Sequence, residues 1–230
     1  MVNRVIIHIR NLMISISWIF NYYSKFSKNM ELRGYYSLGI YKIWLWKEDA
    51  RYFTAYDISG TCFFIKMKPR KKIEFEYSVN DYINQNYLEK IKFYPQIVDS
   101  CTSDFFYNVY EYIDGRKISK STFNKELVNQ IYLILIFFKK HKIIHRDIRP
   151  HNLILYNDTL KIIDFEHCSI NNKAIETPSF LNSKYRFSNK VWDDAFSFKK
   201  IIDQYCSKKK IADNDSYKQI KNMIGELVYE

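Results

Sequence analysis

The residue types best suited to chemistry lie in one short stretch, residues 145–152, which read His-Arg-Asp-Ile-Arg-Pro-His-Asn. A second acidic residue, Asp164, follows twelve positions after Asn152. Transfer of a γ-phosphoryl group to a hydroxyl needs an acceptor for the hydroxyl proton, and a cation with its ligands to neutralise the phosphate oxygens. Asp147 fits the first role, and Asn152 and Asp164 fit the second. The pattern therefore predicts phosphoryl transfer from a nucleotide.

Turn and strand signals explain how these side chains can meet. Pro150 restricts the backbone of the loop. Residues 153–156 and 160–163 are short apolar runs joined by Asn-Asp-Thr, a pattern typical of a β-hairpin. We expect this hairpin to return Asp164 to the side of Asn152. The alternative is a chance His-Arg-Asp tripeptide in a solvated loop, with Asp164 merely ending a strand.

The order of loop, hairpin and second Asp resembles the core of the protein-kinase-like superfamily. Residues 164–166 read Asp-Phe-Glu where protein kinases carry Asp-Phe-Gly. This ending is similar to choline kinases and aminoglycoside phosphotransferases. The His-Arg-Asp start is similar to protein kinases and to small bacterial kinases of lipopolysaccharide core sugars, heptose or Kdo.

The resemblance implies an α+β, two-lobed kinase-like fold with an antiparallel-sheet N-lobe and a reduced helical C-lobe. It also implies ATP and Mg²⁺ as cofactors. The domains would be a basic and apolar N-terminal segment (1–30), the N-lobe and hinge (31–115), and the reduced C-lobe (116–230).

Upstream, Lys66 interrupts the apolar run of residues 61–67 and is similar to the Lys of the Val-Ala-Ile-Lys strand. In that mapping it is a catalytic and cofactor-binding residue that holds the α- and β-phosphates. The alternative is a solvated basic surface, because residues 66–72 contain five cations.

The expected partner of Lys66 is an acid on a helix of about residues 72–85. Glu74 and Glu76 are both candidates. Glu76 is preferred, because the apolar residues three and seven positions beyond it would share its inward face. The connection from Lys66 is short for this family.

The segment before the catalytic loop resembles the fifth strand and hinge of kinases. Residues 105–115 are rich in aromatic and branched residues and end in a glycine-marked turn. In this mapping Tyr110 is the gatekeeper, and the carbonyl of Glu111 and the amide of Ile113 bind adenine. An ordinary strand is the alternative. The apolar residues of 127–137 predict a buried helix leading to the loop.

A glycine-rich phosphate loop is missing from the sequence, which has only five glycines. Residues 33–39 contain two glycines with the wrong spacing and are predicted to form a loop. Strands are expected over 41–47 and 51–57, joined by an acidic connection at 48–50. A phosphate-covering loop without the usual glycines is compatible with small envelope-sugar kinases and also with a pseudokinase.

Several residues around the motifs have predicted supporting roles. Arg149 stands where protein serine kinases usually carry Lys, and it could stabilise charge on the transferring group as a catalytic residue; the alternative is a surface Arg. His145 and Arg146 are expected to support the loop. Asp194, with Asp193 as the alternative, resembles the Asp that hydrogen-bonds the catalytic-loop backbone.

The expected acceptor is compact. Only 66 residues follow Asp164, and none of them reads Ala-Pro-Glu, the motif that accompanies peptide docking in protein kinases. We therefore expect an ATP-dependent phosphotransferase acting on a sugar hydroxyl of lipopolysaccharide core or a related cell-envelope glycan. The alternatives are a choline or aminoglycoside type of small-molecule kinase, a minimal Ser/Thr protein kinase, and a pseudokinase that acts as a binding module.

Composition adds a charge argument. The 230 residues are 47% hydrophobic, enough for a sizeable core, and the net charge is +11. An anionic partner besides ATP is expected, either an acidic glycolipid or an anionic membrane surface. Nucleic acid is not expected, because no binding motif accompanies the basic residues. The alternative is that the charge only keeps the protein soluble.

The first thirty residues allow two interpretations. Residues 5–20 are apolar but interrupted by polar positions, so the uninterrupted part is too short to span a bilayer. An interfacial helix would place Trp18 at the membrane boundary and four cations toward head groups: Arg4, Arg10, Lys25 and Lys28. The alternative is a helix packed on the N-lobe.

Cysteine spacing bears on the compartment. The four cysteines, at positions 62, 101, 168 and 206, lack metal-ligand spacing and a secretory context. A cytoplasmic location is expected, with a peripheral place on the inner face of the cytoplasmic membrane if the N-terminal segment is an anchor.

Overall fold

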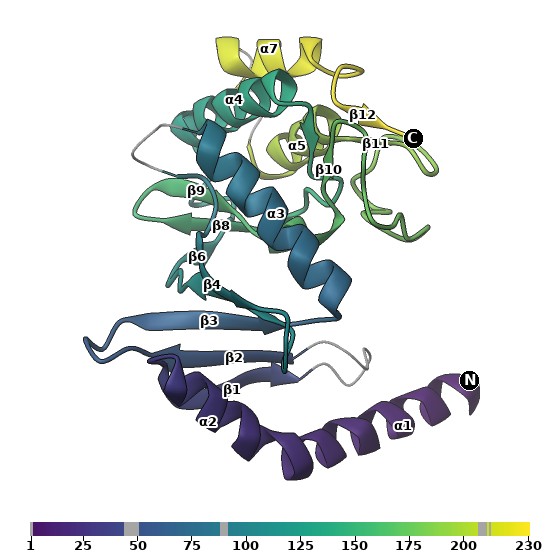
Figure 1. The fold of residues 1–230 in the computed structure, drawn as a ribbon. Helices are drawn as coiled ribbons and strands as arrows, with labels where there is room; N and C mark the ends of the chain where they lie inside the picture. The colour runs from purple at the N-terminus through teal and green to yellow at the C-terminus, as the bar shows by residue number, and fades with distance from the viewer. Residues whose placement is uncertain (1, 44–50, 88–91, 207–210, 212) are drawn as a thin grey trace. The chain divides into compact units, whose positions relative to one another are not determined.

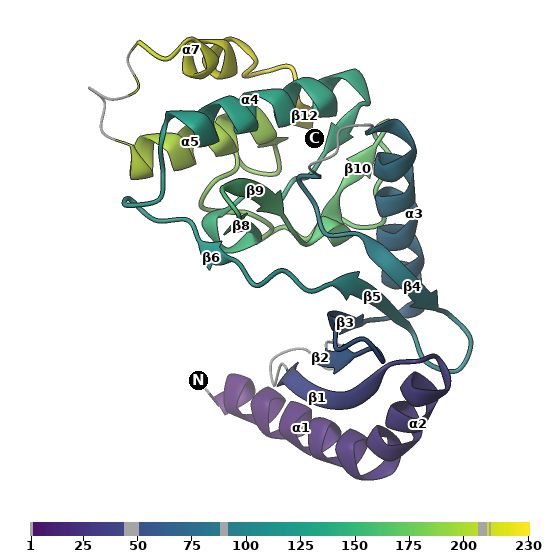
Figure 2. The same ribbon diagram turned by 90° about the vertical axis from the view of Figure 1, so that its left-hand side faces the viewer.

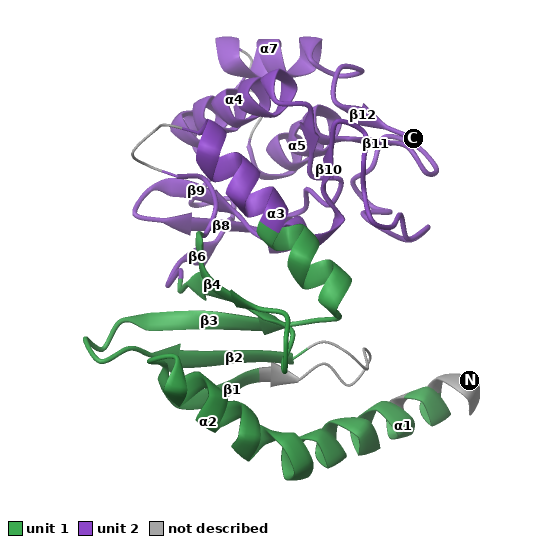
Figure 3. Ribbon diagram, in the orientation of Figure 1, with its two compact units in different colours: residues 1–77, 96–112 green, residues 78–95, 113–230 purple. Residues whose placement is uncertain are grey.

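The computed structural model describes residues 2–43, 51–87, 92–206, 211 and 213–230. The chain divides into two compact units, coloured separately in Figure 3: Met1–Tyr77 with Gln96–Tyr112, and Ser78–Pro95 with Ile113–Glu230. Residues 1–30 thus share unit 1 with the residues that follow them. The chain enters unit 2 for the last time between Tyr112 and Ile113, near the predicted boundary at residue 115.

Unit 1 contains a five-stranded antiparallel sheet (Figure 1), as expected for the N-lobe. Its spatial order is β1-β2-β3-β5-β4. The strands are β1 (Tyr36–Ile43), β2 (Arg51–Tyr56), β3 (Cys62–Met67), β4 (Ile97–Cys101) and β5 (Tyr107–Glu111). Burial in β2 alternates strictly, which places one face of this strand in the core.

The prediction of a loop over residues 33–39 is wrong from Tyr36 onward. β1 begins there and pairs Tyr36 with Tyr56 and Gly39 with Thr54. The register shifts between these pairs, and Ser37 has a φ of 54°. A bulge leaves a residue unpaired and bends the strand locally, so the regular period of a strand is interrupted here. The predicted acidic connection at 48–50, and residues 44–47 of the predicted strand, lie outside the described residues.

Three helical segments precede the sheet: α1 (Val2–Trp18), a π turn η1 (Ile19–Tyr23) and α2 (Ser24–Leu32). They run along one face of the sheet (Figures 1 and 2). Phe26 of α2 is fully buried there, with its ring centroid 5.1 Å from that of Phe53 and 5.4 Å from that of Tyr107. α2 therefore closes the core of unit 1.

Trp18 belongs to the same core. Its ring lies 5.7 Å from Phe53 and 6.1 Å from Phe26, and the guanidinium of Arg51 lies 4.8 Å from its centroid. The prediction that Trp18 lies at a membrane boundary is wrong, because the ring packs inward. No helix within the described ranges is long and apolar enough to cross a membrane.

Unit 2 is mainly helical. α3 (Arg70–Asn86) begins in unit 1 and continues into unit 2 after Tyr77. Among the described residues, this unit also contains the α-helices α4 (Lys125–Lys140), α5 (Asp194–Tyr205) and α7 (Asp215–Asn222). Short strands complete the unit: β6 (Arg116–Lys117), β7 (Ile143–Ile144), β8 (Leu153–Tyr156), β9 (Thr159–Ile162), β10 (Ser169–Ile170), β11 (Trp192–Asp193) and β12 (Val228–Tyr229).

Local signals account for the elements around the catalytic loop. Asn124 caps α4 by accepting the amide of Leu127, and seven apolar residues of α4 are buried. β8 and β9 form the predicted hairpin, and its two turn residues, Asn157 and Asp158, have φ values of 47° and 57°. Left-handed residues at both turn positions match the twist of a two-residue hairpin. The predicted α+β fold class is confirmed.

Gly115 marks a close approach in unit 2. A Cβ placed at this position would lie 2.2 Å from Cγ2 of Ile154 and 2.9 Å from the carbonyl oxygen of Leu155. The strand β8 can therefore pass beside residue 115 only when that residue has no side chain.

We predict that Gly115→Ala destabilises the protein by about 1–3 kcal/mol, the usual effect of overpacking. The backbone oxygen of Leu155 cannot move as a flexible side chain would. The measurement is the free energy of unfolding in urea. Gly39→Ala is the control, because the Cβ there would meet the side-chain oxygen of Thr54 at 3.2 Å and backbone only at 3.9 Å. Equal stability losses for the two variants would contradict the prediction.

Candidate active site

The two carboxylate oxygens of Asp147 have different surroundings. Its Oδ2 accepts the Asn152 amide at 2.9 Å and lies 3.0 Å from Nη2 of Arg149. Asp147 is 1% exposed, and Oδ1 has no hydrogen-bond partner among the described residues. A buried acceptor without a partner is costly and calls for an explanation. Oδ1 is the atom that a proton-donating hydroxyl could approach.

Burial sets the proton affinity of this carboxyl group. Removal from water raises the pKa of Asp147 to about 6, and the positive charge of Arg149 opposes the rise. A base whose pKa lies close to neutral pH is ionised at pH 7 and still able to take a proton.

A tight turn explains the five-residue spacing of Asp147 and Asn152. Residues Pro150–Asn152 form one 3-10 turn. The amide Nδ2 of Asn152 donates to both the carbonyl oxygen and Oδ2 of Asp147, each at 2.9 Å. Because both hydrogens of the Asn152 side-chain amide are used in these bonds, its Oδ1 is the atom that could bind a cation. This is the donor type that Mg²⁺ prefers.

The hairpin brings Asp164 to the loop as predicted. The backbone amide of Ile163 donates to the backbone carbonyl of Asn152 at 3.0 Å. The residue immediately before Asp164 is therefore hydrogen-bonded to Asn152, the other predicted metal ligand. Asp164 has a φ of 69°, a conformation that raises the energy of an L-residue by roughly 1–2 kcal/mol. Strain of this kind is often found at functional sites.

An Asn and an Asp suffice for a nucleotide-linked Mg²⁺ site, since phosphate and water oxygens supply the remaining ligands. The residue types at Asn152 and Asp164 fit that cation. Within the described ranges, no cluster of three or more His, Cys, Asp or Glu residues forms a separate metal site.

The predicted structural role of Asp194 is confirmed. This buried carboxylate accepts the backbone amide of His145 at 2.5 Å and that of Arg146 at 3.1 Å. Burial raises its pKa to about 7. Asp193, the alternative, instead caps α5 by accepting the amide of Phe196.

His145 fastens the loop to the hairpin. Its Nε2 lies 3.1 Å from the carbonyl of Ile163, and its Nδ1 lies 3.3 Å from the amide of Asp147. These partners require a proton on Nε2 and a lone pair on Nδ1. Burial lowers the pKa of His145 to about 4, so the ring is neutral.

Arg146 fastens the loop to the chain that follows the hairpin. Its side chain is fully buried and donates to the carbonyl of His167, to Oγ1 of Thr177 and to the carbonyl of Glu176, the last two at 2.5 Å. The guanidinium also lies 4.3 Å from the ring centroid of Tyr229. His145 and Arg146 therefore both support the loop, as expected.

In unit 1, Lys66 forms a buried ion pair with Glu76. Its Nζ lies 2.9 Å from Oε2 and 3.1 Å from Oε1. Glu74, the other candidate, pairs with Arg70 at 2.7 Å on the exposed side of α3. Helical periodicity selected the correct acid. The alternative interpretation, a solvated basic surface, is wrong for Lys66 and Lys68, which are 4% and 3% exposed.

Asn108 is a supporting residue that the sequence analysis missed. It is the cross-strand partner of Lys66, and its Nδ2 donates to the carbonyl of Ile73 at 3.1 Å, one turn before Glu76. Its Oδ1 accepts from Ser100 at 2.7 Å. Asn108 thus links β5, the strand paired with that of Lys66, to the helix of Glu76. The only sequence signal is an amide within an otherwise apolar strand.

The remaining predicted residues lie as follows. Tyr110 is buried in β5, and the charge of Glu76 contributes, after burial, to raising its pKa. Glu111 ends β5 and is bonded through its backbone amide to Gln96. Ile113 is the first residue of unit 2 after β5. The adenine-binding roles of Glu111 and Ile113 stay predictions, as does the charge-stabilising role of Arg149.

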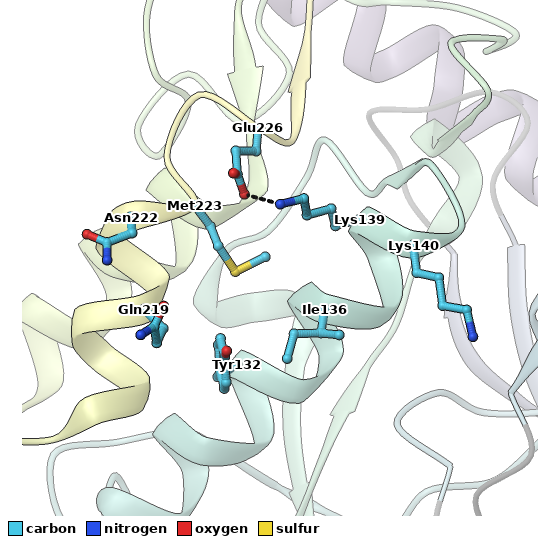
Figure 4. A pocket seen from close by; sticks show the side chains of 8 residues that line it. All are labelled: Tyr132, Ile136, Lys139, Lys140, Gln219, Asn222, Met223 and Glu226. Atoms are coloured by element: carbon cyan, nitrogen blue, oxygen red, sulfur yellow. Dashed lines mark hydrogen bonds and ion pairs between the residues drawn. The ribbon is translucent and has the colours of Figure 1, made fainter.

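Two cavities lie apart from these residues. One, of about 430 Å³, is lined by residues of α4, α7 and the turn after α7 (Figure 4), where Lys139 and Glu226 form an ion pair of 2.9 Å. The other, of about 470 Å³, is lined by residues of unit 1 that include Tyr77 and Asp99. No predicted catalytic, metal or cofactor-binding residue lines either cavity.

A five-stranded antiparallel sheet carrying a buried Lys–Glu pair, together with a helical unit carrying the Asp–Asn–Asp set, defines a kinase-type protein. The sequence model of the protein kinase domain matches residues 71–214. The chain belongs to the protein kinase domain family. The match contains Glu76, Asp147, Asn152 and Asp164, and it begins five residues after Lys66.

The relatives among curated proteins are also kinases. The chain is 34% identical over 101 residues to the dual specificity protein kinase zakA of Dictyostelium discoideum, covering 37% of this chain and 13% of that protein. It is 32% identical over 107 residues to the serine/threonine-protein kinase GRIK2 of Arabidopsis thaliana, covering 39% and 26%. The alignment with the human MAPK/MAK/MRK overlapping kinase shows 31% identity over 93 residues, covering 39% and 22%.

The chain thus spans about a quarter or less of the length of these relatives. Enzymes of this family transfer the γ-phosphoryl group of ATP to hydroxyl groups and use Mg²⁺. The predicted kinase class and the predicted cofactors, ATP and Mg²⁺, agree with the family.

We predict that Asn108→Leu weakens ATP binding and lowers stability by about 1–3 kcal/mol, because it removes a buried amide that links β5 to α3. The KM for ATP should rise more than kcat falls. Steady-state kinetics and urea unfolding measure these effects. Ser100→Ala is the control, since it leaves the Asn108–Ile73 bond in place. An unchanged KM for Asn108→Leu would exclude a positioning role.

The buried His145 predicts a pH dependence of stability. Because its folded pKa is about 4 and the ordinary value is about 6.5, the unfolded chain binds the proton first as pH falls. The contribution of His145 is complete above pH 6.5 and is lost toward pH 4, by up to about 3 kcal/mol.

The pH comparison must be made against His145→Gln, because the raised pKa values of Asp147 and Asp194 give slopes of the opposite sign. The difference in unfolding free energy between wild type and variant should shrink as pH falls from 7 to 4. A constant difference over this range would show that His145 is not buried in its neutral form.

Proposed function

We propose that this protein is an ATP- and Mg²⁺-dependent phosphotransferase in which Asp147 accepts the proton of the attacking hydroxyl. The observation that carries the proposal is the asymmetric environment of this carboxylate. Oδ2 is fixed by Asn152 and Arg149, whereas the buried Oδ1 has no partner among the described residues. A carboxylate that is held in place and has one oxygen without a hydrogen-bond partner is suited to general base catalysis.

The other residues have distinct roles in this proposal. Asn152 and Asp164 would supply oxygen ligands for Mg²⁺, which would neutralise charge on the phosphate oxygens. Lys66, oriented by Glu76, contacts the α- and β-phosphates. Arg149 would stabilise charge on the transferring group. The hydroxyl oxygen forms a bond to the γ-phosphorus as the bond to ADP breaks, and Asp147 takes the hydroxyl proton.

For the acceptor we propose a sugar hydroxyl of lipopolysaccharide core or a related envelope glycan, presented as a sugar or glycolipid. Glu166 in place of the kinase Gly and the absence of an Ala-Pro-Glu string support a compact acceptor. Between β10 and β11 the structure has turns and bends and no helix. The net charge of +11 suits an anionic glycan.

A protein hydroxyl is the second candidate acceptor. The matched family model is that of the protein kinase domain, and two of the relatives described above are named as dual specificity or serine/threonine protein kinases. Choline- or aminoglycoside-type acceptors remain a third class, supported by the Asp-Phe-Glu string alone. A pseudokinase would bind nucleotide without turnover.

We predict that Asp147→Asn lowers Mg-ATP-dependent phosphoryl transfer by about 10²–10⁴-fold, the usual contribution of a general base, while nucleotide binding persists. Turnover is measured with labelled ATP, and binding by calorimetry. Asp158→Asn is the matched control, because Asp158 lies in the exposed β8–β9 turn, where Asn also tolerates a positive φ.

The same assay separates the acceptors, because labelled phosphate is followed into extracted glycolipid, generic protein substrates and aminoglycosides. Label in glycolipid supports the sugar acceptor, and label in protein overturns it. Absence of nucleotide binding by the native protein, or full activity of Asp147→Asn, would overturn the proposed mechanism.

A further inference from the structure

We propose that the outward face of α1 and η1 docks on an anionic membrane surface. This inference concerns a face of unit 1 that carries none of the predicted site residues, and it does not depend on the proposed function.

The face is a continuous apolar stripe. Its residues recur at helical spacing and are all exposed: Ile6, Ile9, Leu12, Met13, Ile16 and Phe20. Phe20 is 83% exposed and Met13 66%. At 1.5 Å per residue the stripe is about 20 Å long. A contiguous apolar surface of this kind normally marks an interaction site.

The opposite face packs on unit 1 and is the more polar one. Asn11 is 2% exposed and Ser15 4%, and Trp18, one turn further on, joins the aromatic core. α1 therefore has its polarity inverted relative to an ordinary surface helix, which would bury Ile and Leu and expose Asn and Ser. Packing within unit 1 does not account for the stripe.

The π turn explains how α1 and α2 can differ. A π turn adds about one residue to a helical turn, so the residues beyond it are rotated by about 100° relative to an unbroken α-helix. In α2 the apolar residues Phe26 and Met30 are fully buried. The turn at Ile19–Tyr23 thus directs Phe26 and Met30 of α2 inward, while the stripe residues of α1 point outward.

The positive charge of the N-terminal segment favours an anionic membrane as the partner of this face. The first 30 residues contain Arg4, Arg10, Lys25 and Lys28 and no Asp or Glu; Arg10, Lys25 and Lys28 are exposed. An apolar stripe flanked by cations is typical of helices that lie in the plane of a membrane interface. Anionic head groups would neutralise these cations.

A second copy of the chain suits the face less well. In a two-fold dimer the same patch meets itself, so the cations Arg10, Lys25 and Lys28 of one copy would be brought near those of the other without any acidic residue of this segment to offset them. Like charges brought together in this way oppose association. The observations therefore favour a membrane.

The test is flotation of the full chain with vesicles of phosphatidylcholine mixed with phosphatidylglycerol, and with phosphatidylcholine alone. We expect binding to the anionic vesicles. The combined substitution of Ile6, Ile9, Met13 and Ile16 by Ser should lower partitioning at least about tenfold, because it removes the side chains that enter the apolar boundary. Lys25→Glu with Lys28→Glu should weaken binding to the anionic vesicles.

The matched control is Ile58→Ser with Phe180→Ser, which removes apolar side chains that are 93% and 75% exposed outside the stripe. Its binding should equal that of the wild type. Unchanged urea unfolding of every variant shows that the fold is intact. Depth is read with Phe20→Trp, whose fluorescence brominated lipids should quench, compared with Ile58→Trp, which they should not.

Three outcomes would overturn the proposal. The native protein fails to float with anionic vesicles; the Ser substitutions leave flotation unchanged; or light scattering reveals a dimer that the Ser substitutions dissociate, without any vesicle binding. The last outcome would assign the stripe to a second copy.

Discussion

The carboxylate of Asp194 is the constraint on which the catalytic loop depends. By accepting the amides of His145 and Arg146, it fixes two successive residues at the start of the loop. Arg146 has a φ of 64°, a strained conformation that needs such support. From these two anchored residues, one side chain reaches the hairpin and the other reaches residues 167–177. The position of Asp147 follows from bonds made by its neighbours.

Several features of the catalytic loop and its surroundings lower the free energy of unfolding. Asp147 and Asp194 are buried carboxyl groups with raised pKa values, and Arg146 and Asp164 both have left-handed backbones. Such features lower stability unless surrounding structure holds them. In unit 2 this surrounding structure consists of the buried apolar residues of α4 and the regular pairing of the β8–β9 hairpin. Stability and chemistry are supplied by different residues of unit 2.

Local patterns made much of this predictable. The turn at residues 157–158 predicted the hairpin, and helical periodicity selected Glu76 over Glu74. Features that depend on distant partners were not predictable: Asn108 acts through Ile73, 35 positions away, and Trp18 packs on Phe53. The bulged start of β1 likewise depends on its pairing with β2. A sequence pattern reports the period of an element, and it does not report which element lies opposite.

The π turn has a consequence for how the N-terminal helices can change. α1 and α2 are joined by a helical turn, so the direction of every side chain in α1 is set by the number of residues between it and Phe26. Substitutions within α1 alter one side chain at a time. Loss of one residue from Ile19–Tyr23 would instead restore α-helical phase and turn either the outer stripe or the buried rings of α2 by about 100°. This part of the chain can therefore vary in composition far more freely than in length.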